Sequence, residues 1–141
     1  MIRAMSAHLV RSDQLYPGAP YAYAAIAPPG SLIFTAGACP INEDGDVQAI
    51  GDYVRQAEDA VANLTVALGA AGASFGDVLK TTVYVASADQ RDLVAVWDVV
   101  HGAFDPHEPP STLLGVSVLG YSGQLVEIEA VALASAASST G

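Results

Sequence analysis

Charged side chains are scarce in this chain. Lys, Arg, Asp and Glu make up 14% of its 141 residues, against about 25% in typical soluble domains, whereas 52% of the residues are hydrophobic. A chain with so little charge is expected to bury part of its surface against other copies of itself. No apolar run reaches the roughly 18 residues that a membrane-spanning helix needs. We therefore expect a homo-oligomer and no membrane partner.

Basic residues are especially rare: five Lys and Arg stand against 15 Asp and Glu, for a formal net charge of −10. None of the five follows Arg91. Binding to a nucleic-acid backbone requires clustered Lys or Arg that displace counterions, and the sequence shows neither such a cluster nor an RNA-reading aromatic motif. No nucleic-acid partner is expected.

Cysteine and histidine patterns give no sign of a metal site. The single cysteine, Cys39, excludes an intramolecular disulfide and is interpreted as a small buried residue, with a reactive thiol as the alternative. His8, His101 and His107 are too widely separated in sequence to indicate a metal cluster. His107, in a proline-rich loop just before Ser111, either lines a cleft or lies at the surface.

The chain length fits a single domain, residues 1–141, with a lead-in at 1–19 and a flexible tail at 134–141. The first residues, MIRAMSAHLVRSDQL, lack the continuous apolar core and the small-residue cleavage site of a secretory signal. A cytoplasmic location is therefore expected.

Hydrophobic periodicity predicts two helices, one from Asp52 and one from about Asp89 to Phe104, ended by Pro106. Alternating or β-branched segments predict strands at 21–27, 31–37, 78–85, 111–119 and 124–133. This order predicts an α+β fold in which a mixed sheet carries both helices on one face. Because segment 113–119 is apolar on both sides, we expect other copies to cover the second face.

The strand at 125–133 carries an unusual pair of carboxylates. Glu127 and Glu129 lie two residues apart among apolar neighbours, so both point to the same face. Paired carboxylates in apolar surroundings are one way in which enzymes keep a proton donor or acceptor available near neutral pH. A solvated sheet edge is the alternative interpretation.

Several sequence blocks, in order, resemble a known family over residues 20–133. They are Pro20-Tyr21, LIFTAG at 32–37, AAGASFGDVLKTTVYV at 70–85 and VEIEAVA at 126–132. These blocks are similar to the reactive intermediate deaminases, also called RidA or YjgF and formerly labelled endoribonuclease L-PSP. The resemblance implies a chorismate-mutase-like α+β subunit and a homotrimer with three ligand clefts between subunits.

The same resemblance implies an activity and a set of site residues. Family members hydrolyse imines and enamines, such as 2-iminobutanoate and 2-iminopropanoate, to carbonyl compounds and ammonia without a cofactor. The family's water-orienting glutamate corresponds to Glu127, with Glu129 beside it, the cleft tyrosine to Tyr21 and the strand glycine to Gly37. Ser111 and Thr112 also match the family pattern and are expected, with His107, to contribute to substrate binding.

One position departs from the family pattern. Where relatives commonly read Pro-Ala-Arg-Ser, this chain has Glu108-Pro-Pro-Ser111, so Pro110 stands where the substrate-binding arginine belongs. Proline offers no donor to a carboxylate, which leaves the substrate open: an uncharged or cationic imine is as compatible as an anionic one. The residues that could replace the arginine are Lys80, Arg91, His101, His107 or an arginine of a neighbouring subunit.

Two functions follow from this departure. The first is a trimeric hydrolase of imine or enamine intermediates in which Glu127 handles water and the substrate is atypical. The second is a non-catalytic trimeric module, chaperone-like or binding small molecules, that kept the cleft and lost catalysis with the arginine.

Overall fold

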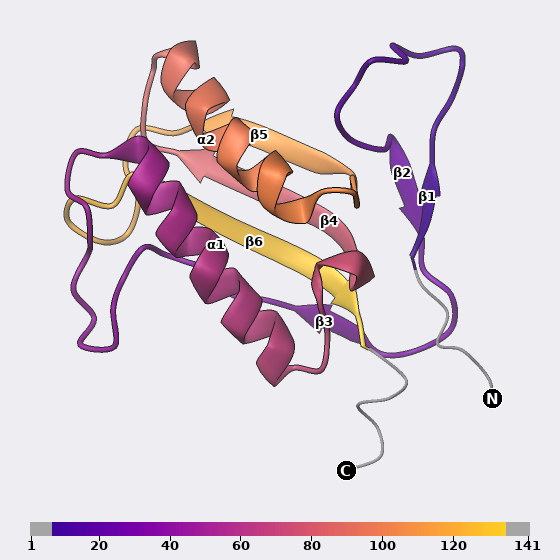
Figure 1. Cartoon of the computed structure of the whole chain (residues 1–141), viewed down its shortest axis with the longest axis horizontal. Helices are drawn as coiled ribbons and strands as arrows, with labels where there is room; N and C mark the ends of the chain where they lie inside the picture. Colours follow the sequence, from indigo (N-terminus) through magenta and orange to yellow (C-terminus); the bar gives the residue numbers. More distant parts are fainter. Residues whose placement is uncertain (1–6, 135–141) are drawn as a thin grey trace.

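The computed structural model describes residues 7–134. Its elements are β1 (His8–Val10), β2 (Ala24–Ile26), β3 (Leu32–Phe34), α1 (Tyr53–Ala70), η1 (Phe75–Asp77), β4 (Val78–Val85), α2 (Gln90–Phe104), β5 (Ser111–Gly115) and β6 (Val126–Leu133). Strands β3-β6-β4-β5 form one sheet, and β1 and β2 form a second (Figure 1). Because β4 and β5 are parallel and the other pairs antiparallel, the larger sheet is mixed. The start of the predicted lead-in, 1–6, and residues 135–141 of the predicted tail lie outside the described residues.

Helix α1 begins where the sequence predicts. The side chain of Asp52 accepts a hydrogen bond from the backbone N–H of Arg55 at 3.0 Å, which satisfies one of the free donors of the first turn. Three- and four-residue steps then bring four fully buried side chains onto one side of the helix, where they meet the sheet: Ala57, Ala60, Leu64 and Leu68.

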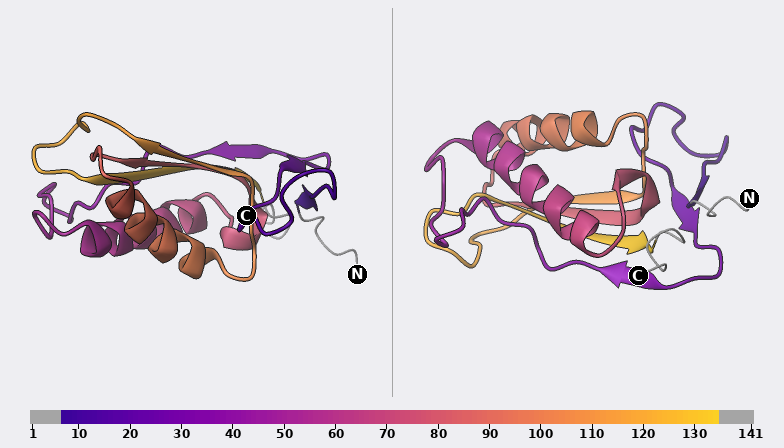
Figure 2. Two further views of the ribbon diagram at one scale, coloured as in Figure 1. Left: turned by 90° about the horizontal axis from the view of Figure 1, so that it is seen from above. Right: turned by 60° about the horizontal axis from the view of Figure 1, so that its bottom comes forward.

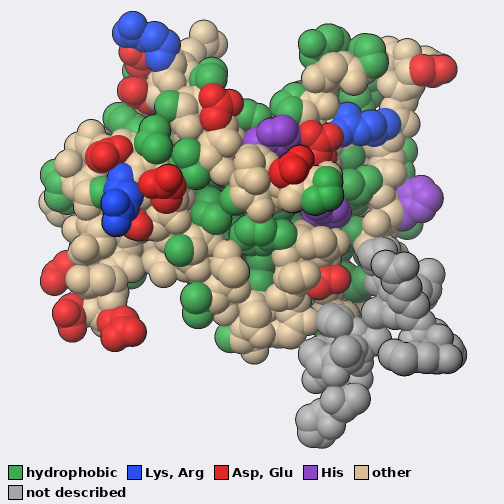
Figure 3. Space-filling view, in the orientation of Figure 1, with side chains coloured by type: hydrophobic (Ala, Val, Ile, Leu, Met, Phe, Trp, Pro, Cys, Tyr) green, Lys and Arg blue, Asp and Glu red, His purple; other side chains and the backbone are tan. Residues whose placement is uncertain are grey.

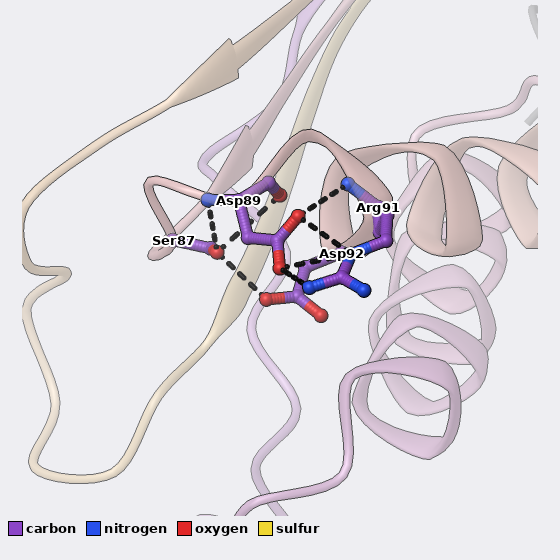
Figure 4. A network of polar contacts seen from close by, with 4 residues as sticks. All are labelled: Ser87, Asp89, Arg91 and Asp92. Atoms are coloured by element: carbon purple, nitrogen blue, oxygen red, sulfur yellow. Dashed lines mark hydrogen bonds and ion pairs between the residues drawn. The ribbon is translucent and has the colours of Figure 1, made fainter.

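Helix α2 is anchored by a polar network at its start. Asp89 accepts from the backbone N–H of Arg91 at 2.9 Å and pairs with its guanidinium at 2.7 Å. Ser87 donates to Asp92 at 2.7 Å and accepts from the backbone N–H of Asp89 at 2.9 Å (Figure 4). The network fixes the turn between β4 and α2, and it commits the side chain of Arg91 to the helix start.

Alternation along the strands gives the larger sheet two different faces. In β6, Val126, Ile128 and Ala130 are buried in one core with residues of both helices, whereas Glu127 and Glu129 point the opposite way and are half-buried. Both helices lie on the core side (Figure 2). The prediction of a mixed sheet with two helices on one face is confirmed.

The opposite face of the sheet exposes several apolar side chains and is not covered by a helix. Phe34 is 74% exposed, Leu32 46% and Leu114 41%. Figure 2, seen from above, shows the helices on one side of the strands and no helix on the other. We call this side, which also carries Glu127 and Glu129, the open face.

The helix side presents a mixed surface. In Figure 3, the Lys and Arg side chains in view are separated from one another and lie beside acidic side chains. Arg11 pairs with Glu108, and Arg55 with Asp59 at 3.5 Å. Positive charge on this side is therefore neutralised locally rather than gathered into a basic patch.

Strand boundaries are where the structure differs from the sequence prediction. The lead-in contains β1, which pairs with β2 through Leu9 and Ala25. The strand predicted at 111–119 ends at Gly115, because its parallel partner β4 ends at Val85. One further hydrogen bond, from Val116 N–H to Val85 O at 2.8 Å, closes the ladder.

Candidate functional site

Glu127 is held in place on the open face by two donors. Its Oε1 accepts from Nε2 of Gln124 at 3.1 Å and from the thiol of Cys39 at 3.4 Å. Both donors bond Oε1, and neither of them bonds Oε2. A carboxylate oriented through one oxygen can use the other to bind and polarise a water molecule.

The orientation of Gln124 is itself fixed. Its side chain is 3% exposed, its Oε1 accepts from the backbone N–H of Tyr121 at 3.1 Å, and its Nε2 also donates to the carbonyl of Val126 at 3.1 Å. Because the carbonyl end of this amide is occupied by an N–H donor, the amino end must face Glu127. The sequence analysis did not identify Gln124, whose only signal was a polar residue three positions before Glu127.

Gly37 lies against the carboxylate of Glu127. A Cβ at position 37 would overlap the Oε2, Cδ and Cγ atoms of Glu127, so only glycine allows this approach. An adjoining hollow of about 520 Å³ is lined by seven residues: Gly37, Cys39, Ile41, Asn42, Glu43, Asn63 and Tyr121. The structure thus brings together two of the predicted site residues, Gly37 and Glu127; of these, Gly37 lines the hollow and Glu127 does not.

The pKa of the Cys39 thiol is affected by the neighbouring carboxylate of Glu127. Partial burial, the hydrogen bond to Glu127 and its negative charge raise the pKa of the thiol from 9.0 to about 11. The thiol is therefore protonated near neutral pH and acts as a donor. This favours the small, partly buried Cys39 over the reactive thiol.

Alkylation of Cys39 by iodoacetamide tests this contact. The rate is expected to rise with a midpoint near pH 11, which at pH 8 leaves about 100-fold less thiolate than in a thiol of pKa 9.0. In Glu127→Gln the negative charge is lost, so the midpoint is expected to move down. A midpoint near 9 in the wild-type protein would show that the contact does not exist in solution; slow access alone would lower the rate without moving the midpoint.

Glu129 is engaged by a tyrosine of the neighbouring strand. Tyr84 donates its hydroxyl to Oε1 of Glu129 at 2.5 Å, and that hydrogen bond is the main reason why the pKa of Tyr84 is raised. Thr82 lies opposite Glu129 and Tyr84 opposite Glu127 in the register of β4 and β6. The two glutamates therefore have different partners although they share a face.

Ser111 and Thr112 lie on opposite faces of β5. The hydroxyl groups of Ser111 and Thr81 are 2.5 Å apart on the helix side of the sheet. Thr112 lies on the open face and accepts a hydrogen bond from Nζ of Lys80 at 2.6 Å. Pro110, just before them, is tied to β4 through its carbonyl, which accepts from Thr81 N–H at 3.0 Å.

Tyr21 and His107 lie away from Glu127 in the single chain. Tyr21 packs edge-on against Trp97 of α2, with ring centroids 6.4 Å apart. The Nε2 of His107 bonds to the carbonyl of Val78 at 2.8 Å, and the residue lines an apolar hollow of about 620 Å³ on the helix side.

The predicted site residues therefore fall into two groups. Glu127 lies opposite Tyr84 in β4, whereas Ser111 lies opposite Thr81, three residues earlier in the same strand. Three residues of strand span about 10 Å, and β6 and β5 are two strand spacings, again about 10 Å, apart. A molecule the size of a small imine cannot contact both Glu127 and Ser111 of one chain.

Within residues 7–134 there is no group of three or more His, Cys, Asp or Glu side chains arranged to hold a metal ion. In the same part of the chain, no helix has the length and apolar character needed to cross a membrane.

Comparisons with known proteins agree with the fold. The family described as Endoribonuclease L-PSP matches residues 11–134. The 2-iminobutanoate/2-iminopropanoate deaminase of Escherichia coli is 33% identical over 108 residues, 74% of this chain and 80% of that protein. Protein DfrA of Myxococcus xanthus is 32% identical over 134 residues, 94% of this chain and 99% of that protein.

Solved structures give the same assignment. The structure of YyfB from Yersinia pestis, a protein of the conserved Rid family, superimposes with a TM-score of 0.85 at 26% identity, and the match covers 92% of this chain and 99% of that one. The chain therefore belongs to the endoribonuclease L-PSP family, also called the RidA or YjgF family.

Proposed function

We propose that this protein hydrolyses reactive imines or enamines to a carbonyl compound and ammonia, in clefts between the subunits of a homotrimer. The observation that carries the proposal is the carboxylate of Glu127, held through Oε1 by Gln124 and Cys39 with its other side against Gly37. Relatives at 33% identity are named 2-iminobutanoate/2-iminopropanoate deaminases, which supports the same reaction class.

The proposed reaction requires only general acid–base catalysis from the protein. An imine carbon is already electrophilic, so water adds to it once Glu127 orients the water and accepts one of its protons. Glu127 returns that proton to the nitrogen, which gives a neutral carbinolamine with a hydroxyl and an amino group on one carbon. Glu127 then takes the hydroxyl proton and passes it to the amino group as the C–N bond breaks, so ammonia and the carbonyl compound leave and the carboxylate is restored. The reaction consumes one water and requires no cofactor.

A trimer would cover the exposed apolar side chains of the open face and complete the cleft with residues of a second subunit. The open face exposes Phe34, Leu32 and Leu114, and burial of apolar surface contributes about 25 cal/mol per Å². Packing open faces together would cover these side chains and bring Glu127 of one subunit near Thr112 of another, whereas the Ser111 side chain stays on the helix side. Gly37 is proposed to shape the same cleft and Glu129 to contribute to substrate binding, whereas the packing of Tyr21 on α2 and the bond of His107 to Val78 give neither a place on the open face.

The alternative, a non-catalytic module, is favoured by Pro110 at the position of the family's arginine. Measurements of turnover and of ligand binding distinguish it from the hydrolase. Imines are generated with an amino-acid oxidase, and ammonia release is measured with and without the protein. The hydrolase is expected to accelerate release from at least one imine. A parallel thermal-shift screen uses carboxylates, amides and neutral carbonyl compounds. Binding without any acceleration would support the small-molecule or chaperone-like module instead.

A further inference from the structure

Lys80 occupies the place next to the missing arginine. In the parallel pair of β4 and β5, Thr81 lies opposite Ser111, which puts Lys80 beside Pro110. The hydrogen bond from Thr81 N–H to Pro110 O, 3.0 Å long, ties the two strands at this point. Neighbouring side chains in paired strands share a face, and Lys80 projects onto the open face with Thr82 and Tyr84. A side chain at position 110 would project there as well.

Lys80 also has no ion-pair partner among the described residues, 7–134. Among the Lys and Arg side chains of residues 7–134, it is the one without a carboxylate at ion-pair distance, and its Nζ instead donates to the neutral hydroxyl of Thr112 at 2.6 Å. The remaining cations of this part of the chain form the ion pairs Arg11–Glu108, Arg55–Asp59 and Arg91–Asp89. Lys80 therefore keeps donors free for an anionic ligand, on a face that also carries Glu127 and, diagonal to Lys80 across the strand pair, Glu129.

We propose that Lys80, with the hydroxyl of Thr112, binds the carboxylate of an anionic substrate, a 2-imino acid, in place of the arginine. This inference rests on the proposed function for the identity of the substrate. An ammonium group has three donors; one contacts Thr112, and the others are available to a carboxylate. The Thr112 hydroxyl accepts from Lys80 and can donate its own proton to the same carboxylate. Lysine acts as a point charge rather than a planar fork, so it holds the substrate less rigidly than arginine.

The water-handling group must then come from a second copy of the chain. Lys80 leans from β4 toward Thr112 on β5, whereas Glu127 on β6 leans toward Gly37, beyond the other edge of β6. The register separates Lys80 from Tyr84, the residue opposite Glu127, by four positions, about 13 Å of strand. The carboxylate and imine carbons of a 2-imino acid are adjacent, so they cannot reach both groups within one chain.

Binding of pyruvate, the stable product of 2-iminopropanoate hydrolysis, tests the inference without requiring turnover. Calorimetry compares pyruvate with pyruvamide, its neutral counterpart, in the wild-type protein and in Lys80→Gln. The substitution is expected to weaken pyruvate binding roughly 10-fold to 100-fold and to leave pyruvamide binding nearly unchanged. Pro110→Arg in the Lys80→Gln background is expected to restore pyruvate binding, because both side chains serve the same spot.

Oligomer mass and melting temperature accompany each titration. Equal pyruvate affinity in the wild-type protein and in a Lys80→Gln protein of unchanged mass would overturn the assignment. A second result would also overturn the assignment: Lys80→Gln dissociates part of the oligomer, and the fraction that stays assembled binds pyruvate as the wild-type protein does. Lys80 would then serve to pair with a carboxylate of another copy rather than to bind substrate. Failure of the wild-type protein to accelerate imine hydrolysis, with Lys80-dependent pyruvate binding intact, would refute the proposed function and not the carboxylate site.

Discussion

Replacement of Glu127 by glutamine is expected to lower kcat for imine hydrolysis by about 100-fold to 10,000-fold, the range typical of a lost general acid–base group. Glutamine keeps the length of the side chain and its approach to Gly37, so the cleft is expected to retain its shape. It cannot take a proton from water. Because substrate binding is assigned to other residues, KM is expected to change far less than kcat.

The matched control is Glu58→Gln on the exposed side of α1, which removes the same charge away from the open face. It is expected to keep the wild-type kcat. Ammonia release from oxidase-generated 2-iminopropanoate, measured for proteins of equal oligomer mass, gives both values. Wild-type turnover in Glu127→Gln would remove this carboxylate from the mechanism.

Replacement of Phe34 by aspartate is expected to dissociate the proposed trimer and, with it, to abolish hydrolysis. Phe34 is 74% exposed in the single chain and lies on the open face, so in the trimer its ring would be buried. The substitution removes about 1.5–3 kcal/mol of apolar burial per side chain. It also places an unpaired carboxylate in an apolar interface, which costs several kcal/mol more. Light scattering at micromolar concentration is expected to give the monomer mass.

Val66→Asp is the matched control for Phe34→Asp. Val66 is 70% exposed on α1, so it tests the same change from apolar to acidic on the helix side. It is expected to leave mass and activity at wild-type values. A fully active Phe34→Asp monomer would mean that a single chain holds the whole site.

Local signals in the sequence were sufficient for the helices and the central strands. Asp52 and Asp89 were recognisable as helix starts because a cap needs only a side-chain acceptor within its own turn. The strand predicted at 78–85 matches β4, whose buried and half-buried residues alternate over most of its length. The shared face of Glu127 and Glu129 followed from the two-residue period of a strand.

Contacts between distant segments could not be predicted in the same way. Cys39 reaches Oε1 of Glu127 because Ala38 pairs with Ile128 of β6, a contact across some ninety residues that leaves no periodic signal. The pairing of β1 with β2 and the early end of β5 likewise depend on which strand lies alongside. The place of Lys80 beside Pro110 also required the strand register.

The most direct test of a cleft shared between subunits is the activity of mixed trimers. Glu127→Gln and Lys80→Gln chains are co-expressed with different tags, and assemblies carrying both tags are purified. Some clefts then combine an intact Glu127 from one chain with an intact Lys80 from another. Hydrolysis of 2-iminopropanoate below KM is predicted to exceed that of either variant alone, whereas activity no higher than the average of the two separate variants would contradict a site built from two chains.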